Sequence, residues 1–173
     1  MLPEDARSLE FTAMSPKPAA SSPTLAPKFV LESDQGKRVS LDDFAGKWLI
    51  VYFYPRDNTP GCTREAADFT KAAPALKKLG AEVVGISKDS VKSHCGFRDK
   101  MGISFRLLSD PDLAAHKAYG AWGTKNMYGK KVEGTIRSTF LVSPEGKIAR
   151  TWKSVKVDGH AERVIEALRE AKG

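Results

Sequence analysis

The residues best suited to chemistry stand close together before position 63. Pro55, Thr59 and Cys62 lie in the segment Pro-Arg-Asp-Asn-Thr-Pro-Gly-Cys, and Cys62 is one of two cysteines in 173 residues. The sequence predicts a helix with Thr59 as N-cap and Pro60 in its first position. A thiol in that first turn lies beside unpaired backbone N–H groups, where helix starts bring the pKa of cysteines from ~8.5 into the range ~3.5–7.5. We therefore predict a reactive thiolate at Cys62.

A less reactive interpretation is that Cys62 is one more small buried residue, as free cysteines often are. The predicted helix start, the proline- and glycine-rich neighbourhood and the apolar strand just before it favour the reactive interpretation. A disulfide exchanger of the C-x-x-C type would carry a second cysteine three residues later, and that position holds Glu65. The spacing therefore excludes a C-x-x-C oxidoreductase.

The elements around this segment follow a β-α-β-α-β order. Residues 48–54 are apolar on both alternating faces, which is typical of a central strand covered on both sides. Apolar periodicity and turn residues predict further elements, namely helices at 59–79, 89–101 and 111–119 and strands at 82–87 and 105–109. An N-terminal hairpin at 28–32 and 38–41 precedes them.

The C-terminal part predicts a hairpin of strands 137–142 and 147–152, then a helix that Asp158 can cap. A βαβ unit followed by a ββα unit is the arrangement of thioredoxin-like proteins. We therefore predict an α/β, thioredoxin-like fold with a central mixed sheet flanked by helices and an N-terminal β-hairpin. The fold alone assigns no function.

Two segments lack a regular apolar pattern. Residues 1–27 are rich in proline, alanine and serine, so we predict a flexible extension ahead of a domain at 28–173. Residues 120–134 hold four glycines with Trp122 and Tyr128, and we predict an ordered loop with packed aromatic side chains.

Charge and cysteine count narrow the function classes. The net charge is +7, of which residues 1–27 contribute −1, and basic residues alternate with acidic ones through the rest of the chain. Such a diffuse surplus favours no nucleic-acid or membrane partner. Two cysteines exclude a disulfide scaffold and a four-cysteine metal site. The acidic N-terminus without an apolar targeting region predicts a cytoplasmic protein.

The segment from Phe53 to Phe69 resembles the active-site segment of the peroxiredoxins, specifically the bacterioferritin comigratory (Q-type) subfamily. The family pattern Pro-x-x-x-Thr/Ser-x-x-Cys is met at Pro55, Thr59 and Cys62. Other stretches are also similar to that subfamily, namely 89–94, 105–110 and 137–141. The resemblance covers about residues 27–171.

This resemblance implies a thiol peroxidase that needs no metal, haem or flavin. Cys62 would be the peroxidatic cysteine, which attacks the O–O bond of hydrogen peroxide or an organic hydroperoxide and becomes a sulfenic acid. Thr59 and Arg137, the latter brought beside the thiol by a neighbouring strand, would stabilise charge on the leaving oxygen. Pro55 would shield the pocket from water, and Glu65 would orient Arg137. The alternative for Arg137 is an ordinary surface ion pair.

The second cysteine departs from the subfamily pattern. Many members carry a resolving cysteine where this chain has Ala67, and others directly after a helical phenylalanine, where it has Arg98. Cys95 lies one helical turn earlier on a similar face, so one hypothesis is a Cys62–Cys95 disulfide, which requires local unwinding because the Cα atoms must come within ~7 Å. The other is a one-cysteine enzyme in which Cys95 only packs. The resemblance implies a monomer and a reductant such as thioredoxin, or glutaredoxin with glutathione.

Two other function classes stay open on the sequence. A basic nucleic-acid-binding protein with a vestigial thiol would fit the charge, but the chain has no helix-turn-helix, zinc or RNP signature. A redox sensor or chaperone would use the same oxidation as a switch. His94, His116 and His160 have no partner motif, and we predict solvated or capping roles for them.

Overall fold

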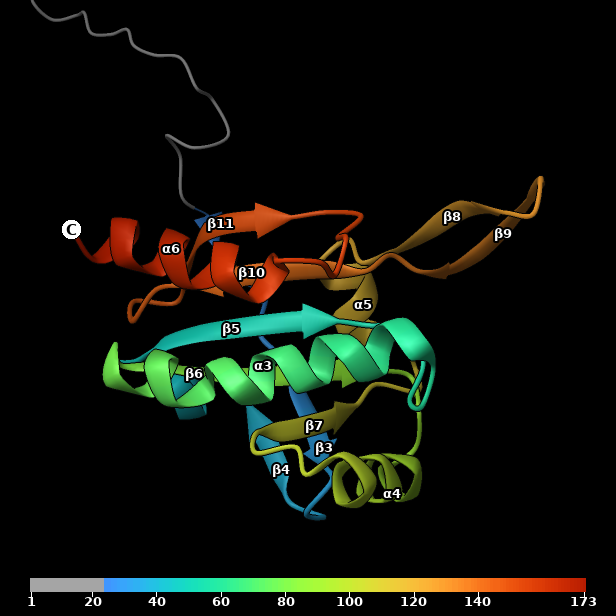
Figure 1. Ribbon diagram of the computed structural model, residues 1–173, viewed down its shortest axis with the longest axis horizontal. Coiled ribbons are helices and arrows are strands. Elements are labelled where there is room, and N and C mark those ends of the chain that lie inside the picture. The colour runs from blue at the N-terminus through green and yellow to red at the C-terminus, as the bar shows by residue number, and fades with distance from the viewer. Residues whose placement is uncertain (1–23) are drawn as a thin grey trace, which may run out of the picture.

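The apolar run before the thiol segment forms the centre of an eight-stranded sheet (Figure 1). The computed structural model describes residues 24–173. The strands are β2 (Thr24–Leu25), β3 (Val30–Ser33), β4 (Arg38–Ser40), β5 (Trp48–Phe53), β6 (Ala81–Ser87), β7 (Arg106–Ser109), β8 (Trp122–Met127), β9 (Lys130–Thr135), β10 (Ser138–Val142) and β11 (Lys147–Trp152). The helices are the 3-10 helix η1 (Leu41–Phe44) and the α-helices α3 (Pro60–Lys78), α4 (Val91–Met101), α5 (Ala114–Ala118) and α6 (His160–Lys172).

The sheet is mixed, in the order β2-β11-β10-β5-β6-β7-β3-β4. Strands β5, β6 and β7 run parallel, and the other neighbours are antiparallel. This arrangement confirms the predicted α/β class, the central mixed sheet and the N-terminal hairpin of β3 and β4.

Strand β5 is buried on both faces, as its apolar pattern predicts. Ile50 and Tyr52 face a core that is closed by α3, α4 and α6, whereas Leu49, Val51 and Phe53 face a second core under α5 and η1. In Figure 1, α3 and α6 lie together over the first face. The end of β5 is therefore a fixed platform for the loop that follows it. No helix among residues 24–173 is long and apolar enough to cross a membrane.

The domain begins before residue 28. Residues 24 and 25 form β2, which pairs with β11, and Ala26 is buried with its N–H bonded to the Gly146 carbonyl at 2.8 Å. Residues 24 and 25, which the composition assigns to the extension, therefore pair with the sheet. Sequence composition misses this because one short edge strand needs only backbone pairing. The prediction for residues 1–23 lies outside the described residues.

The prediction of a loop at 120–134 is wrong, because most of these residues form the antiparallel hairpin of β8 and β9. Its strands are polar and contain glycines, so they lack the apolar alternation that marks a half-buried strand. Tyr128 does not pack, since it is 99% exposed at the tip. The last helix also differs slightly from the prediction, with Gly159 rather than Asp158 in the N-cap position.

The three histidines are buried, which corrects the prediction of solvated or capping roles. His116 accepts or donates hydrogen bonds with Asp110 at 2.7 Å and Thr135 at 3.1 Å. His160 is 2% exposed, and its Nε2 lies 2.8 Å from the Thr139 hydroxyl. The sequence offers no sign of these partners because they lie on other elements.

We predict that His160 makes the free energy of unfolding depend on pH. Burial, together with the charges of Arg163 and Arg137, lowers the pKa of His160 to about 4. The unfolded chain binds a proton at this residue below about pH 6.5 and the folded chain does not, so stability falls from pH 6.5 toward pH 4. We expect this residue to account for a loss of up to about 3 kcal/mol.

The measurement is urea unfolding of the wild type and of His160→Gln at pH 7 and pH 4.5. Glutamine keeps a polar group toward Thr139 but does not titrate there, so the variant should lose less stability between the two pH values than the wild type. Equal losses in both proteins would contradict the assignment.

Candidate active site

Cys62 lies in the first turn of α3, which follows the loop after the end of β5. Its side chain is 1% exposed. Thr59 is the N-cap with extended backbone, and its carbonyl accepts the Thr63 N–H at 2.8 Å, as the capping prediction requires. The Thr59 hydroxyl, however, donates to the Arg56 carbonyl at 2.9 Å instead of capping a backbone N–H. The Thr59 side chain therefore leaves the backbone N–H groups of the first turn of α3 without a cap hydrogen bond.

Arg137 reaches this thiol from the strand beside β5. It directly precedes β10, whose first residue Ser138 pairs with Phe53 at the end of β5. The Arg137 Nη2 atom donates to the Cys62 Sγ atom at 3.4 Å. A Cβ atom on Gly61 would lie 3.1 Å from the same nitrogen, so the absent side chain leaves room for the guanidinium. The pairing of β10 with β5 thus brings the two predicted site residues, Arg137 and Cys62, into contact.

Glu65 shares this guanidinium with the thiol. It is buried one turn after Cys62, and its Oε1 atom accepts from Arg137 Nη1 at 2.6 Å. Burial raises the pKa of Glu65 to about 7, although Arg137 acts to lower it. Its other carboxyl oxygen has no hydrogen-bond partner. The site therefore holds one fixed cation between a sulfur atom and a carboxyl group that titrates near neutrality.

Tyr52 forms part of the wall behind the thiol, a role that the sequence did not reveal. Its ring stacks on Phe69 at 4.9 Å between centroids, and its buried hydroxyl has no hydrogen-bond partner. Burial, followed by the negative charges of Glu65 and Cys62, raises the pKa of Tyr52. Tyr52 therefore stays neutral within the buried cluster that also contains Cys62. The alternation of β5 places it on this face but cannot show what it touches.

A buried hydrogen-bond network fastens the loop between β5 and α3 to α4. The Asp57 carboxylate accepts from Tyr54 at 2.6 Å and Ser93 at 2.7 Å, and it lies 2.8 Å from His94 Nδ1. The other ring nitrogen of His94 lies 3.0 Å from the Leu108 carbonyl. Burial raises the pKa of Asp57, but the hydrogen bonds from His94, Tyr54 and Ser93 outweigh it and leave this pKa below its usual value. The network couples the thiol loop to the helix that carries Cys95.

Cys95 lies apart from the Cys62 contacts. Its thiol donates to the Asp34 carbonyl at 2.8 Å, and Arg98 Nη1 lies 2.9 Å from the Asp34 carboxylate. Cys95 and Arg98 therefore contact the same residue, which agrees with the predicted similar face of the helix. Both cysteines are free thiols. In this reduced form, Arg137 and Glu65 meet at Cys62, and Cys95 is engaged elsewhere.

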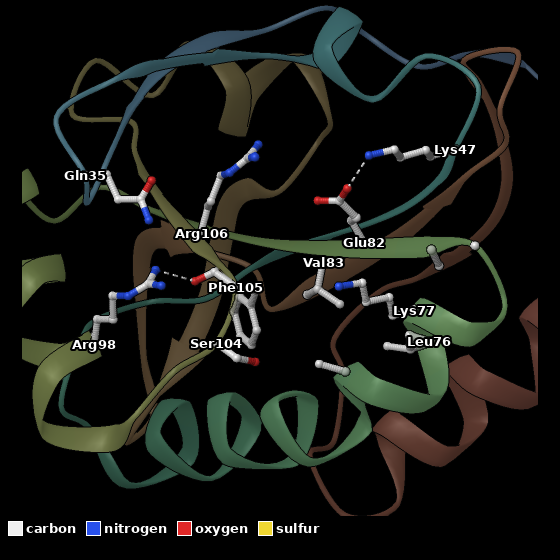
Figure 2. Close-up of a pocket in the computed structure, with 13 residues that line it drawn as sticks. Gln35, Lys47, Leu76, Lys77, Glu82, Val83, Arg98, Ser104, Phe105 and Arg106 are labelled. Carbon is white, nitrogen blue, oxygen red and sulfur yellow. Dashed lines mark hydrogen bonds and ion pairs between the residues drawn. The ribbon is translucent and has the colours of Figure 1, made fainter.

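The side chain of Arg98 also lines a cavity of about 490 Å³ (Figure 2). Leu76 and Lys77, from the last turns of α3, lie on its opposite side. They lie 14 and 15 positions after Cys62 on the same helix, which corresponds to about 20 Å along its axis. This cavity therefore lies at the far end of α3 from the thiol, and the thiol chemistry does not use it.

Comparison with known proteins agrees with the fold and identifies the family. Residues 24–151 match the AhpC/TSA family. The chain is 51% identical to peroxiredoxin Bcp of Xanthomonas campestris over 134 residues, which cover 78% of this chain and 84% of that protein. It is 39% identical to peroxiredoxin Bcp of Bacillus subtilis over 145 residues, covering 84% and 92% of the two chains.

Solved structures give the same result. A structure of Xanthomonas campestris peroxiredoxin Q matches with a TM-score of 0.79 and 48% identity over 82% of this chain and 90% of that one. A second structure, with a TM-score of 0.80 and 47% identity over 84% and 92%, concerns the alkyl peroxide reduction activity of the bacterioferritin comigratory protein of the same organism. The resemblance and the thioredoxin-like fold are thereby confirmed. The chain belongs to the AhpC/TSA family and, within it, to the thiol peroxidases of the peroxiredoxin Bcp (Q) group.

Proposed function

We propose that this chain reduces hydrogen peroxide and organic hydroperoxides at Cys62, and that a dithiol such as thioredoxin regenerates it. The observation that carries the proposal is the donation from Arg137 Nη2 to the Cys62 sulfur at 3.4 Å, inside a first helical turn. Arg137 thus places a positive charge and a hydrogen-bond donor beside the sulfur that would act as the nucleophile.

The first step is a two-electron transfer. The Cys62 thiolate attacks one oxygen of the O–O bond, an S–O bond forms, and the O–O bond breaks. The sulfur is oxidised to a sulfenic acid, and the peroxide is reduced to water or an alcohol once the leaving oxygen takes a proton. The negative charge moves from sulfur to the leaving oxygen during this step, so a donor that contacts both stabilises the transition state.

The surrounding residues serve that charge transfer. Arg137 would stabilise the charge at both stages of the transfer. Glu65 holds its guanidinium through Nη1 at 2.6 Å, and its Nη2 atom stays free to donate to the sulfur. The Thr59 hydroxyl would donate to a peroxide oxygen after it leaves the Arg56 carbonyl, to which it now donates at 2.9 Å. Pro55, half-buried at the end of β5, shields the pocket from water. Glu65, with its pKa near 7, holds Arg137 in place as a positioning residue.

We further propose that Cys95 resolves the sulfenic acid. The Cys95 sulfur attacks the Cys62 sulfur and gives up its proton, an S–S bond forms, and the S–O bond breaks so that the leaving hydroxide takes that proton and departs as water. The first turn of α3 must unwind and the Cys95 thiol must leave the Asp34 carbonyl, because the present contacts hold the two thiols in different places. A dithiol reductant then opens the disulfide by two exchange steps and is itself oxidised.

Mass spectrometry after one equivalent of peroxide tests the role of Cys95. We expect a loss of two hydrogens that maps to a linked pair of peptides containing Cys62 and Cys95. A stable sulfenic acid on Cys62, with Cys95 still open to alkylation, would instead show that the enzyme works with one cysteine. The variant Cys95→Ser is the control, since its Cys62 should stop at the sulfenic acid.

The overall proposal is tested by peroxide consumption in a coupled assay with thioredoxin and its reductase. We expect steady consumption by the wild type with both hydrogen peroxide and an organic hydroperoxide. Consumption with dithiothreitol but with no protein dithiol would keep the peroxidase step and refute the thioredoxin step. Consumption with neither reductant would refute the whole cycle.

A further inference from the structure

The β8–β9 hairpin stands out from the rest of the chain, as a ribbon that projects from the domain in Figure 1. Within residues 24–173 its two strands pair only with each other and not with the main sheet. The hairpin carries Lys125, Lys130 and Lys131 against a single acidic residue, Glu133. It is therefore a projecting, positively charged surface that the fold does not need for its cores.

The tip of the hairpin holds a tyrosine, Tyr128, in a left-handed backbone conformation that this residue type rarely adopts. Tyr128 has φ +54° and Gly129 has φ +80°, the pair of left-handed conformations that two-residue hairpins prefer to fill with Asn-Gly. A tyrosine in that conformation is strained, because its Cβ approaches the following carbonyl. Its ring is also 99% exposed to water. Tyrosine is enriched in protein interfaces, so the tip has the composition of a contact residue.

The base of the hairpin is joined to the active site. Lys125 Nζ donates to the Thr135 carbonyl at 2.9 Å, and Thr135 lies two residues before Arg137. The Ile136 N–H donates to the Ala121 carbonyl at 2.7 Å and closes the base. The glycine at position 134 leaves room for the aliphatic part of the Lys125 side chain, because a Cβ atom there would lie 3.0 Å from Lys125 Cε. Six residues of strand then carry the tip about 20 Å from this base.

We propose that the β8–β9 hairpin is the docking surface for the protein dithiol that regenerates the enzyme, an inference that rests on the proposed function. That partner must approach the thiol site to exchange disulfides. A domain of about 100 residues has a radius of gyration of about 13 Å, so a partner seated at the site is large enough to contact the hairpin as well. The surplus of lysines selects a partner with an acidic face. Lys88, which lies 5.7 Å over the Trp122 ring, adds a cation near the base.

The variant Tyr128→Asn tests the tip without disturbing the turn, because asparagine is a preferred residue at that φ. We expect its kcat/KM for thioredoxin to fall on the order of tenfold, as for a central aromatic contact. The oxidation of Cys62 by peroxide and the turnover with dithiothreitol should be unchanged. Tyr128→Trp should retain most of the kcat/KM for thioredoxin.

The double variant Lys130→Glu with Lys131→Glu tests the charge. We expect a similar loss with thioredoxin and a weaker dependence of kcat/KM on salt. The matched control is Lys77→Glu with Lys78→Glu, which makes the same charge change on exposed residues at the far end of α3 and should leave kcat/KM near the wild-type value.

Three results would overturn the docking proposal while leaving the peroxidase function standing. One is an unchanged kcat/KM for thioredoxin in both hairpin variants. Another is an equal loss with thioredoxin and with dithiothreitol, which would place the effect on the thiol site itself. The third is a dimer in sedimentation experiments that Tyr128→Asn dissociates, which would assign the tip to a second copy of this chain. A wild type that consumes no peroxide with any reductant would instead refute the proposed function.

Discussion

Replacing Cys62 with serine is expected to lower peroxide consumption by at least about a thousandfold. A serine hydroxyl stays protonated at neutral pH and is a poor nucleophile, so the O–O bond meets no attacking atom even though Arg137 still lies beside the site. The size of the side chain hardly changes, and the fold should be kept. The measurement is the rate of peroxide loss with excess dithiothreitol, alongside the thermal melting of both proteins.

Cys95→Ser is the matched control for this experiment. It makes the same chemical change at a thiol that contacts the Asp34 carbonyl rather than Arg137, so oxidation by the first equivalent of peroxide should proceed at the wild-type rate. Full turnover by Cys62→Ser would show that the proposed nucleophile is wrong. A loss of the first oxidation in Cys95→Ser would show that the two cysteines do not have separate roles.

The second large effect concerns Arg137. Replacing it with methionine should slow the oxidation of Cys62 by roughly 100- to 1000-fold, because a fixed donor to the developing charge is lost. The same change leaves Glu65 buried without its ion-pair partner. An unpaired buried carboxylate costs about 3–5 kcal/mol, so we expect the unfolding free energy to fall by an amount of this order at pH 8.

The pH dependence of this loss follows from Glu65. Burial raises the pKa of Glu65 to about 7 even with Arg137 present. A group whose pKa is raised in the folded state favours the fold most when protonated, and that contribution is lost as the pH rises from about 4.5 through 7. Without Arg137 the carboxyl holds its proton more tightly, so Arg137→Met should lose less stability relative to the wild type at pH 6 than at pH 8.

The double variant Arg137→Met with Glu65→Gln separates the two roles of Arg137. Glutamine cannot ionise, so the double variant should recover most of the stability that Arg137→Met loses. It should not recover the rate, since no cation contacts the sulfur. Recovery of the rate as well would mean that Arg137 acts only by neutralising Glu65. Single-turnover oxidation rates and urea unfolding at pH 6 and pH 8 provide both readouts.

Most of the framework around the thiol could be predicted from local sequence. The apolar run of β5, the N-cap at Thr59 and the helix after it depend on residues that are near one another in the chain. Patterns of that kind can be recognised in the sequence without knowledge of the fold. The β8–β9 hairpin escaped prediction for the opposite reason. Its polar strands bury little apolar surface, and its turn carries a tyrosine where glycine or asparagine signals a hairpin.

The buried polar partners also escaped prediction. His94 lies 37 residues from Asp57, and its ring shows no partner until α4 packs beside the thiol loop. Cys95 likewise meets the carbonyl of a residue 61 positions away. A histidine or cysteine on a helix has the same local pattern whether it faces water or a carboxylate, so the sequence alone favours the commoner solvated role.

The amino-acid sequence by itself determined the position of the proposed nucleophile Cys62, because a thiol after a buried strand and in a first helical turn is a local arrangement. It also determined the mixed α/β class, since apolar periodicity follows the order of the elements. Only the tertiary structure decided what surrounds the sulfur. Arg137 is 75 residues from Cys62, and the antiparallel register of β10 on β5 brings them within 3.4 Å. Contacts of that kind depend on how the strands pair, and strand pairing leaves no local mark in the sequence.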